Sequence, residues 1–104
     1  MLPEVEGLVA ADVAILLFYS EHRWRFAAPP ATVATNTPVS QSHANRRCKA
    51  LEAAGLLELA DERGYYRITT LGLRYMAGEV TAEVIEANIA ESTSESAEDD
   101  DVDE

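Results

Sequence analysis

The chain has 104 residues, of which 47% are hydrophobic, and its formal net charge is −11. This length predicts one small domain with appendages and a modest core. Its single cysteine, Cys48, excludes an internal disulfide, no cysteine–histidine cluster indicates zinc, and no apolar run is long enough to cross a membrane. We therefore expect a cytoplasmic protein with no metal, cofactor or evident small-molecule ligand, and we interpret Cys48 as a buried small hydrophobe.

The charges are unevenly distributed along the chain. All eight lysine and arginine residues lie between residues 23 and 74, whereas residues 75–104 carry eleven acidic residues and no basic one. The middle of the chain is thus a basic module between acidic flanks, which keeps a nucleic-acid partner compatible with the negative net charge. The single lysine, against 19 acidic residues, resembles the composition of proteins from salt-accumulating halophiles.

The N-terminal residues 1–7 are short and polar, which predicts a flexible terminus. A first helix is predicted over residues 8–22, because apolar side chains recur along one of its faces. Asp12 falls on that same side, and Phe18 belongs either to the core or to a partner surface. The apolar face consists of Ile15, Leu16 and Tyr19.

Residues 23–30 read RWRFAAPP. We interpret them mainly as a loop whose aromatic side chains close the edge of a small core. The alternative is a second patch that contacts phosphates or a partner, because arginine and tryptophan favour such surfaces. A short second helix is predicted from Pro30 to Asn36, since proline suits the first helical turn, with Val33 and Ala34 facing the core.

The third helix, predicted over residues 40–54, has two different faces. Ser40 can cap its N-terminus, and Gly55 can end it in a left-handed conformation. At about 100° per residue, the small and apolar face consists of Ala44, Cys48 and Leu51. The opposite, polar face consists of Ser42, Asn45, Arg46 and Lys49. Cationic and amide groups suit phosphates and base edges, although a solvated helix face with scattered cations is an equally simple interpretation.

Alternating runs on both sides of the turn Asp61–Gly64 predict a β-hairpin over residues 57–68. The next helix is expected to be capped by Thr69 or Thr70 and to end at Gly78. Its expected core contacts are Leu71, Tyr75 and Met76.

A further helix is expected over residues 79–90, with an apolar stripe of Val80, Val84, Ile85 and Ile89. This stripe is either a dimer seam or a face that packs back on the first helix. Residues 91–104 are acidic and serine-rich, so we expect them to be disordered. They would act as a solubilising tail or, alternatively, as an electrostatic mimic of DNA.

The order of these elements is that of a winged helix-turn-helix, an α+β and mainly helical fold. It comprises a three-helix bundle and a two-stranded wing, to which this chain adds a C-terminal helix and the acidic tail. The runs SHANRRCKALEAAGLLEL and RGYYRITTLGLRYMAGE resemble the winged-helix domains of halophilic archaea, including the phage phiH repressor-like group. The resemblance covers about residues 8–80, and we place the domain at residues 8–78.

The resemblance implies a repressor-like transcriptional regulator that binds specific double-stranded DNA with recognition helix 40–54 and wing 57–68. It assigns groove-facing roles to Ser42, Asn45, Arg46 and Lys49. On the wing it assigns a phosphate or minor-groove contact to Arg63. Arg47 would neutralise a phosphate or, from the edge of the buried face, pair with an acid such as Asp12.

A homodimer would double the DNA contacts, and we expect one. The alternative function is a winged-helix protein–protein interaction module without DNA binding, which the acidic wing and tail favour. We do not expect an enzyme, because His22 and His43 are far apart in sequence and no nucleophile motif or glycine-rich phosphate loop is present.

Overall fold

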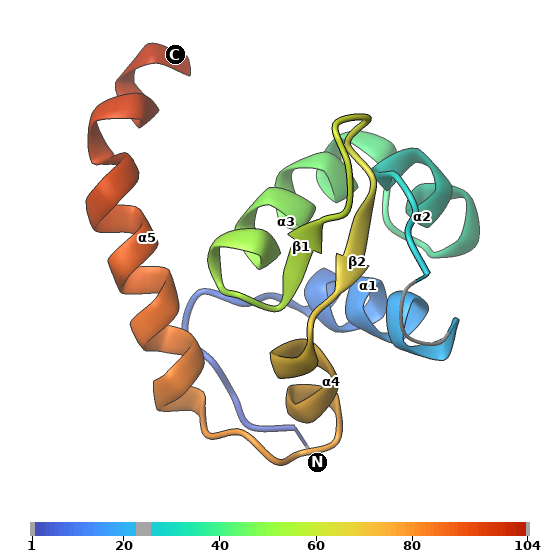
Figure 1. The fold of residues 1–104 in the computed structure, drawn as a ribbon, viewed down its shortest axis with the longest axis horizontal. Helices are drawn as coiled ribbons and strands as arrows, with labels where there is room; N and C mark the ends of the chain where they lie inside the picture. The colour runs from blue at the N-terminus through green and yellow to red at the C-terminus, as the bar shows by residue number, and fades with distance from the viewer. Residues whose placement is uncertain (1, 23–25, 104) are drawn as a thin grey trace.

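The structure is a computed structural model that describes residues 2–22 and 26–103, with side chains as far as residue 92. In chain order its elements are α1 (Ala10–Glu21), α2 (Pro30–Asn36), α3 (Gln41–Ala53), β1 (Leu57–Leu59), β2 (Tyr66–Ile68), α4 (Thr70–Met76) and α5 (Ala82–Asp103) (Figure 1). The predicted mainly helical α+β fold, with three helices followed by a two-stranded wing, is confirmed. Within the described ranges, no helix combines the length and apolar character that spanning a bilayer requires.

The core lies where α1, α2, α3 and the hairpin meet. Ile15, Leu16 and Tyr19 of α1 have no exposed surface, and Val33 of α2 is equally buried. Phe18 also belongs to the core, with 6% of its surface exposed. On α3 the predicted inward face is confirmed, since Ala44, Cys48 and Leu51 are all fully buried. This burial turns the polar face of α3 outward.

Local capping signals set both ends of α3. The Ser40 hydroxyl accepts a hydrogen bond from the backbone N–H of His43, as expected of an N-cap residue. At the other end Gly55 has a φ of 84°, its N–H bonds to the Glu52 carbonyl, and the N–H of Leu56 bonds to the Leu51 carbonyl. These two bonds form a Schellman motif, which ends the helix one residue before the predicted boundary.

The hairpin pairs β1 with β2 in antiparallel register, with Glu58 opposite Arg67. A third segment, which the sequence pattern did not predict, also pairs with the hairpin. Ala28 forms an isolated antiparallel bridge with Tyr66, through two backbone hydrogen bonds of 2.9 Å. The bridge links the segment before α2 to the wing. The two prolines of this segment keep it extended, because each restricts the backbone conformation of the residue before it.

The helix α4 crosses close to the end of β2. Thr69 caps it by accepting a hydrogen bond of 2.9 Å from the N–H of Gly72. A Cβ placed on Gly72 would meet the Leu56 carbonyl oxygen and would lie 2.6 Å from Cγ1 of Ile68. Glycine is therefore the residue that lets the helix approach the strand this closely.

The C-terminal helix differs from the sequence expectation. We expected helix only to residue 90, but α5 continues to Asp103, and no glycine or proline occurs after Gly78 to end it. Its apolar stripe is mostly turned inward: Ile85 is fully buried, Val80 and Ile89 pack against the core, and Val84 is 46% exposed. α5 packs mainly against α3, and Asn88 donates a hydrogen bond of 2.9 Å to the Ala54 carbonyl at the C-terminal end of α3 (Figure 1).

The N-terminal segment lies against the domain. Val5 is 5% exposed, and the Tyr75 hydroxyl donates a hydrogen bond to the Pro3 carbonyl. The N–H of Glu6 donates to the carboxylate of Glu86 on α5 at 2.9 Å. Residues 2–9 therefore connect α4 and α5 to the start of α1.

Candidate nucleic-acid interface

The outward face of α3 carries the predicted recognition residues. Ser42, Asn45, Arg46 and Lys49 are all exposed. They are exposed because the small residues opposite them, Ala44 and Cys48, are packed against α1 and α2 with no exposed surface. The face combines a hydroxyl, an amide and two cations on a rigid element, which is the chemistry used to contact bases and phosphates.

Two of these cations are free of internal partners. Arg46 and Lys49 make no hydrogen bond or ion pair with any residue that the structure describes. The other described arginines all lie within ion-pairing distance of acids, in the pairs Arg47–Asp12, Arg63–Asp61, Arg67–Glu58 and Arg74–Glu79. Among the described residues, cations without an acidic partner are therefore concentrated on α3.

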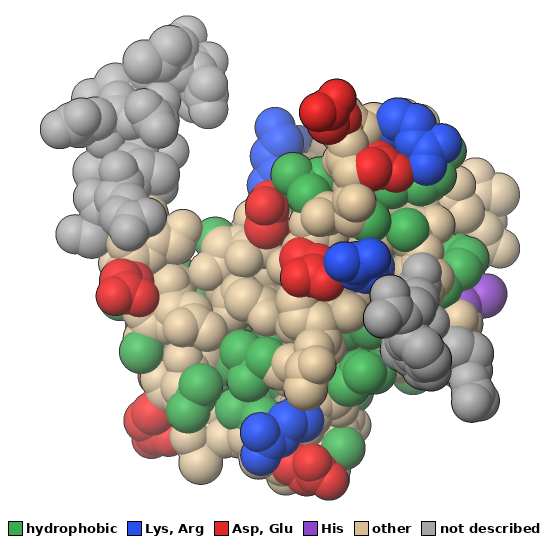
Figure 2. Space-filling view, viewed as in Figure 1, with side chains coloured by type: hydrophobic (Ala, Val, Ile, Leu, Met, Phe, Trp, Pro, Cys, Tyr) green, Lys and Arg blue, Asp and Glu red, His purple; other side chains and the backbone are tan. Residues whose placement is uncertain are grey.

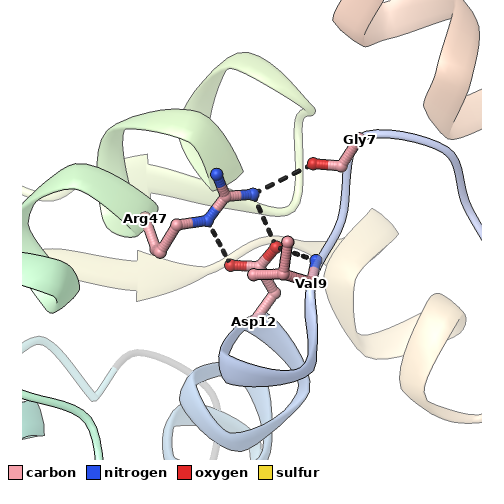
Figure 3. A network of polar contacts seen from close by, with 4 residues as sticks. All are labelled: Gly7, Val9, Asp12 and Arg47. Carbon is pink, nitrogen blue, oxygen red and sulfur yellow. Dashed lines mark hydrogen bonds and ion pairs between the residues drawn. The ribbon is translucent and has the colours of Figure 1, made fainter.

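Arg47 is engaged inside the protein (Figure 3). Its Nε and Nη2 donate to the two carboxylate oxygens of Asp12 at 2.8 and 2.7 Å, and Nη2 also donates to the Gly7 carbonyl at 3.0 Å. Asp12 is fully buried. Its carboxylate also accepts a hydrogen bond from the backbone N–H of Val9 and so caps the N-terminus of α1. The hydrogen bonding of its guanidinium to the Asp12 carboxylate raises the pKa of Arg47. Of the two predicted roles of Arg47, the structure shows the pairing with Asp12.

On the wing, Arg63 is held by its neighbours. Its Nη2 and Nε donate to Oδ2 of Asp61 at 2.7 and 3.2 Å, and its backbone N–H donates to Oδ1 of the same residue at 2.8 Å. The guanidinium carbon lies 4.1 Å from the centre of the Tyr65 ring. The side chain is nevertheless 69% exposed. The hydrogen bonds from Arg63 lower the pKa of Asp61, so this acid is ionised at neutral pH.

A shallow groove of about 290 Å³ joins the wing to the recognition helix. Its lining comprises Pro29, Pro30, Ala31, Gln41, Asn45, Lys49, Arg63, Gly64 and Tyr66. The structure thus brings three predicted site residues together, Asn45 and Lys49 from α3 and Arg63 from the wing. Ser42 and Arg46 lie on the same helix but outside this lining. Gln41 also lines this groove and was not among the predicted site residues, although its position directly after the N-cap was a usable signal.

The wing end of the molecule also carries acids. Asp61 and the exposed Glu62 flank Arg63 in the hairpin turn. Figure 2 shows basic and acidic side chains interleaved over this end of the molecule. The positive surface of α3 therefore does not continue unbroken over the wing.

The proposed second basic patch falls on residues 23–25, which are outside the described residues. The neighbouring Phe26 is half-buried and packs edge-on against Phe18, with ring centres 5.7 Å apart. It also stacks on His22 at 4.7 Å. Phe26 thus closes the edge of the core, as the loop interpretation of this segment predicts.

Cys48 has the environment of a core residue. It is fully buried on the inner face of α3, and burial raises the pKa of its thiol to about 12. A thiol in this state remains protonated at neutral pH and is a poor nucleophile. The interpretation of Cys48 as a small buried hydrophobe is confirmed.

Comparison with known proteins relates the whole arrangement to one family. A family model described as "Winged helix-turn-helix phage repressor" matches residues 1–88. The "Repressor protein" of Halobacterium phage phiH is 36% identical over 84 residues, which cover 79% of this chain and 93% of the phage protein. No solved structure gives a significant match. The family match includes the N-terminal segment and the first turns of α5 and ends before the acidic segment.

Proposed function

Because the chain belongs to the winged helix-turn-helix phage repressor family, we propose that it is a transcriptional regulator that binds a specific double-stranded DNA sequence. The observation that carries the proposal is the exposed face of α3, where Arg46 and Lys49 have no partner within the described part of the chain. An arginine that is held at a buried carboxylate, as Arg47 is by Asp12, would have to break that pair before meeting DNA. Arg46 and Lys49 are available without that step.

Each residue of the face has a role that its chemistry suits. Arg46 would donate two hydrogen bonds to a guanine edge in the major groove, and Asn45 would address adenine or a phosphate. Lys49 and Arg63 would neutralise DNA phosphates from the two sides of the protein groove that they line. Ser42 would donate a hydrogen bond to the DNA backbone. A bidentate base contact contributes about 1–3 kcal/mol of discrimination against the wrong base. Arg47 is not part of this proposal, because Asp12 already occupies its guanidinium.

The small number of available cations has a consequence for salt dependence. Each neutralised phosphate adds a slope of about −0.9 to the logarithmic dependence of affinity on salt. A few contacts give a shallow slope, so binding would persist at high ionic strength better than that of a strongly basic protein. This suits the cytoplasm of a salt-accumulating host, which is where we propose that the regulator acts.

We also propose that the regulator is a homodimer, which would double the specific contacts on a symmetric site. The inward orientation of Ile85 and Ile89 argues against α5 as the seam. The helix α1 instead exposes Val13 and Leu17, and its N-cap residue Val9 precedes them at the same four-residue spacing. The three side chains are 37%, 45% and 46% exposed, respectively. This face exposes three large apolar side chains, whereas Val84 is the large apolar side chain exposed to a similar degree on the described part of α5.

A second candidate is a protein–protein interaction module, which the acids beside Arg63 favour. Selection of binding sites from a random duplex library by the full chain separates the two candidates. We expect enrichment of one motif, loss of discrimination at one base pair in Arg46→Ala, and no change in Arg74→Ala. Arg74→Ala is a suitable control because it also removes one positive charge, but from α4. The Arg74 side chain is 60% exposed and lies near Glu79. Failure to enrich any motif in low and high salt would leave the interaction module as the better account.

A further inference from the structure

We propose that Asp61 is a positioning residue for DNA contact, which holds the guanidinium of Arg63 on the wall of the groove so that its remaining N–H groups meet a backbone phosphate. This inference rests on the proposed DNA-binding function. It assigns a favourable role to an acid that would otherwise be expected only to repel DNA.

Three restraints act on the Arg63 side chain. Asp61 accepts from its Nε and Nη2, and the ring of Tyr65 lies beneath its guanidinium. Asp61 also accepts the backbone N–H of Arg63, so the same carboxylate fixes the turn and the side chain. Nη1 and the second hydrogen of Nη2 have no acceptor among the described residues. The pair thus leaves part of the guanidinium free to donate to a further anion.

Arg63 borders the groove that Lys49 also lines. Gly64 lines the same groove and has a φ of 86°, and apart from its two chain neighbours no described residue has an atom within 4 Å of the position that its Cβ would take. This open space lets a phosphate approach the wing backbone closely. A phosphate placed there would be shared by Lys49 from the helix and Arg63 from the wing.

The benefit of Asp61 is one of preorganisation. An exposed arginine that is free to rotate loses side-chain entropy when it binds a phosphate. Arg63 is already ordered by Asp61 and Tyr65, so less entropy is lost on binding. The opposing effect is repulsion between the Asp61 carboxylate and the phosphate, which salt screens at an exposed site. The two effects predict opposite signs for the removal of Asp61.

The chain supplies a matched control in Glu62. It is the next residue of the same turn, is exposed, and has no hydrogen bond or ion pair with any residue in the described ranges. Glu62→Gln therefore removes one negative charge from the wing without releasing Arg63. Asp61→Asn removes the same charge, but its amide oxygen can still accept the Arg63 backbone N–H, while the amide nitrogen cannot accept the guanidinium. Comparing Asp61→Asn with Glu62→Gln therefore separates the effect of the Asp61–Arg63 side-chain pair from effects on the turn and on the net charge.

The experiment measures affinity by fluorescence anisotropy on the DNA motif enriched by wild type, at several salt concentrations. We expect Glu62→Gln to bind slightly more tightly, and Asp61→Asn to bind about two- to fivefold more weakly, the size of effect typical of exposed ion pairs. Arg63→Ala should weaken binding and reduce the salt slope by about 0.9. In the Arg63→Ala background, Asp61→Asn should no longer weaken binding. Unchanged circular dichroism of each variant checks the fold.

Tighter binding by Asp61→Asn, equal to that of Glu62→Gln in both backgrounds, would overturn the proposal and leave Asp61 as a repelling charge only. An Arg63→Ala variant with wild-type affinity and salt slope would overturn it as well. Both outcomes are distinct from failure of the proposed function, in which wild type itself enriches no motif and the positioning role falls with it.

Discussion

The guanidinium of Arg47 and the fully buried carboxylate of Asp12 join the recognition helix to α1 through two charge-assisted hydrogen bonds, although 35 residues separate them in sequence. The same carboxylate caps α1, and the same guanidinium reaches the Gly7 carbonyl. The position of α3 therefore depends on a polar network at its inner edge as well as on apolar packing.

We predict that Arg47→Ala destabilises the protein by about 3 kcal/mol, because it leaves a buried carboxylate without its charge partner. Urea unfolding followed by circular dichroism measures this free energy. The control is Arg46→Ala, which removes the same charge one residue earlier from an exposed side chain without an internal partner and should change stability little. Equal stability of the two variants would contradict a structural role for the pair.

We predict that Gly72→Ala lowers the free energy of unfolding by about 1–3 kcal/mol, since the added methyl group must displace backbone at Leu56 or the side chain of Ile68. Thermal unfolding measures the change. Thr70→Ala, at an exposed position in the same helix, is the control and should have a small effect. A Gly72→Ala variant as stable as wild type would show that α4 can move away from the strand without loss.

We predict that Cys48 in the folded protein resists alkylation at pH 8.5, because burial raises its pKa to about 12 and shields the sulfur. Mass spectrometry after iodoacetamide treatment, with and without urea, measures the modified fraction. The folded state retains the proton that the unfolded state releases near its ordinary pKa. Stability should therefore fall as pH rises from about 9 toward 12, and none of this contribution is lost below about pH 8. Fast labelling without urea would be inconsistent with the buried thiol.

We predict that Leu17→Glu shifts the protein toward the monomer in sedimentation equilibrium, because it places a charge on the apolar face of α1. Val84→Glu, at an equally exposed apolar position on α5, is the matched control and should leave the association state unchanged. A shift caused by Val84→Glu alone would return the interface to α5. A wild-type monomer at every concentration would exclude the homodimer.

Local signals account for the parts of the fold that were predicted well. Ser40 and Gly55 set the ends of α3 through bonds to residues at most five positions away. The turn before Gly64 specifies the hairpin in the same way. Ala44, Cys48 and Leu51 recur at spacings of four and three residues, with polar residues between them. This spacing was enough to predict which face of α3 is buried, because helical periodicity fixes the direction of every side chain.

The sequence by itself thus determined the order of the elements, the caps of α3 and α4, and the outward face that carries Arg46 and Lys49. Only the tertiary structure decided that Arg47 turns inward to Asp12, that Ala28 pairs with the wing, and that Ile85 packs against the domain. Each of these outcomes depends on groups that are distant in the chain. The sequence offers each of these groups several possible partners with the same chemistry. Tertiary packing decides which of those partners lies close enough to make the contact.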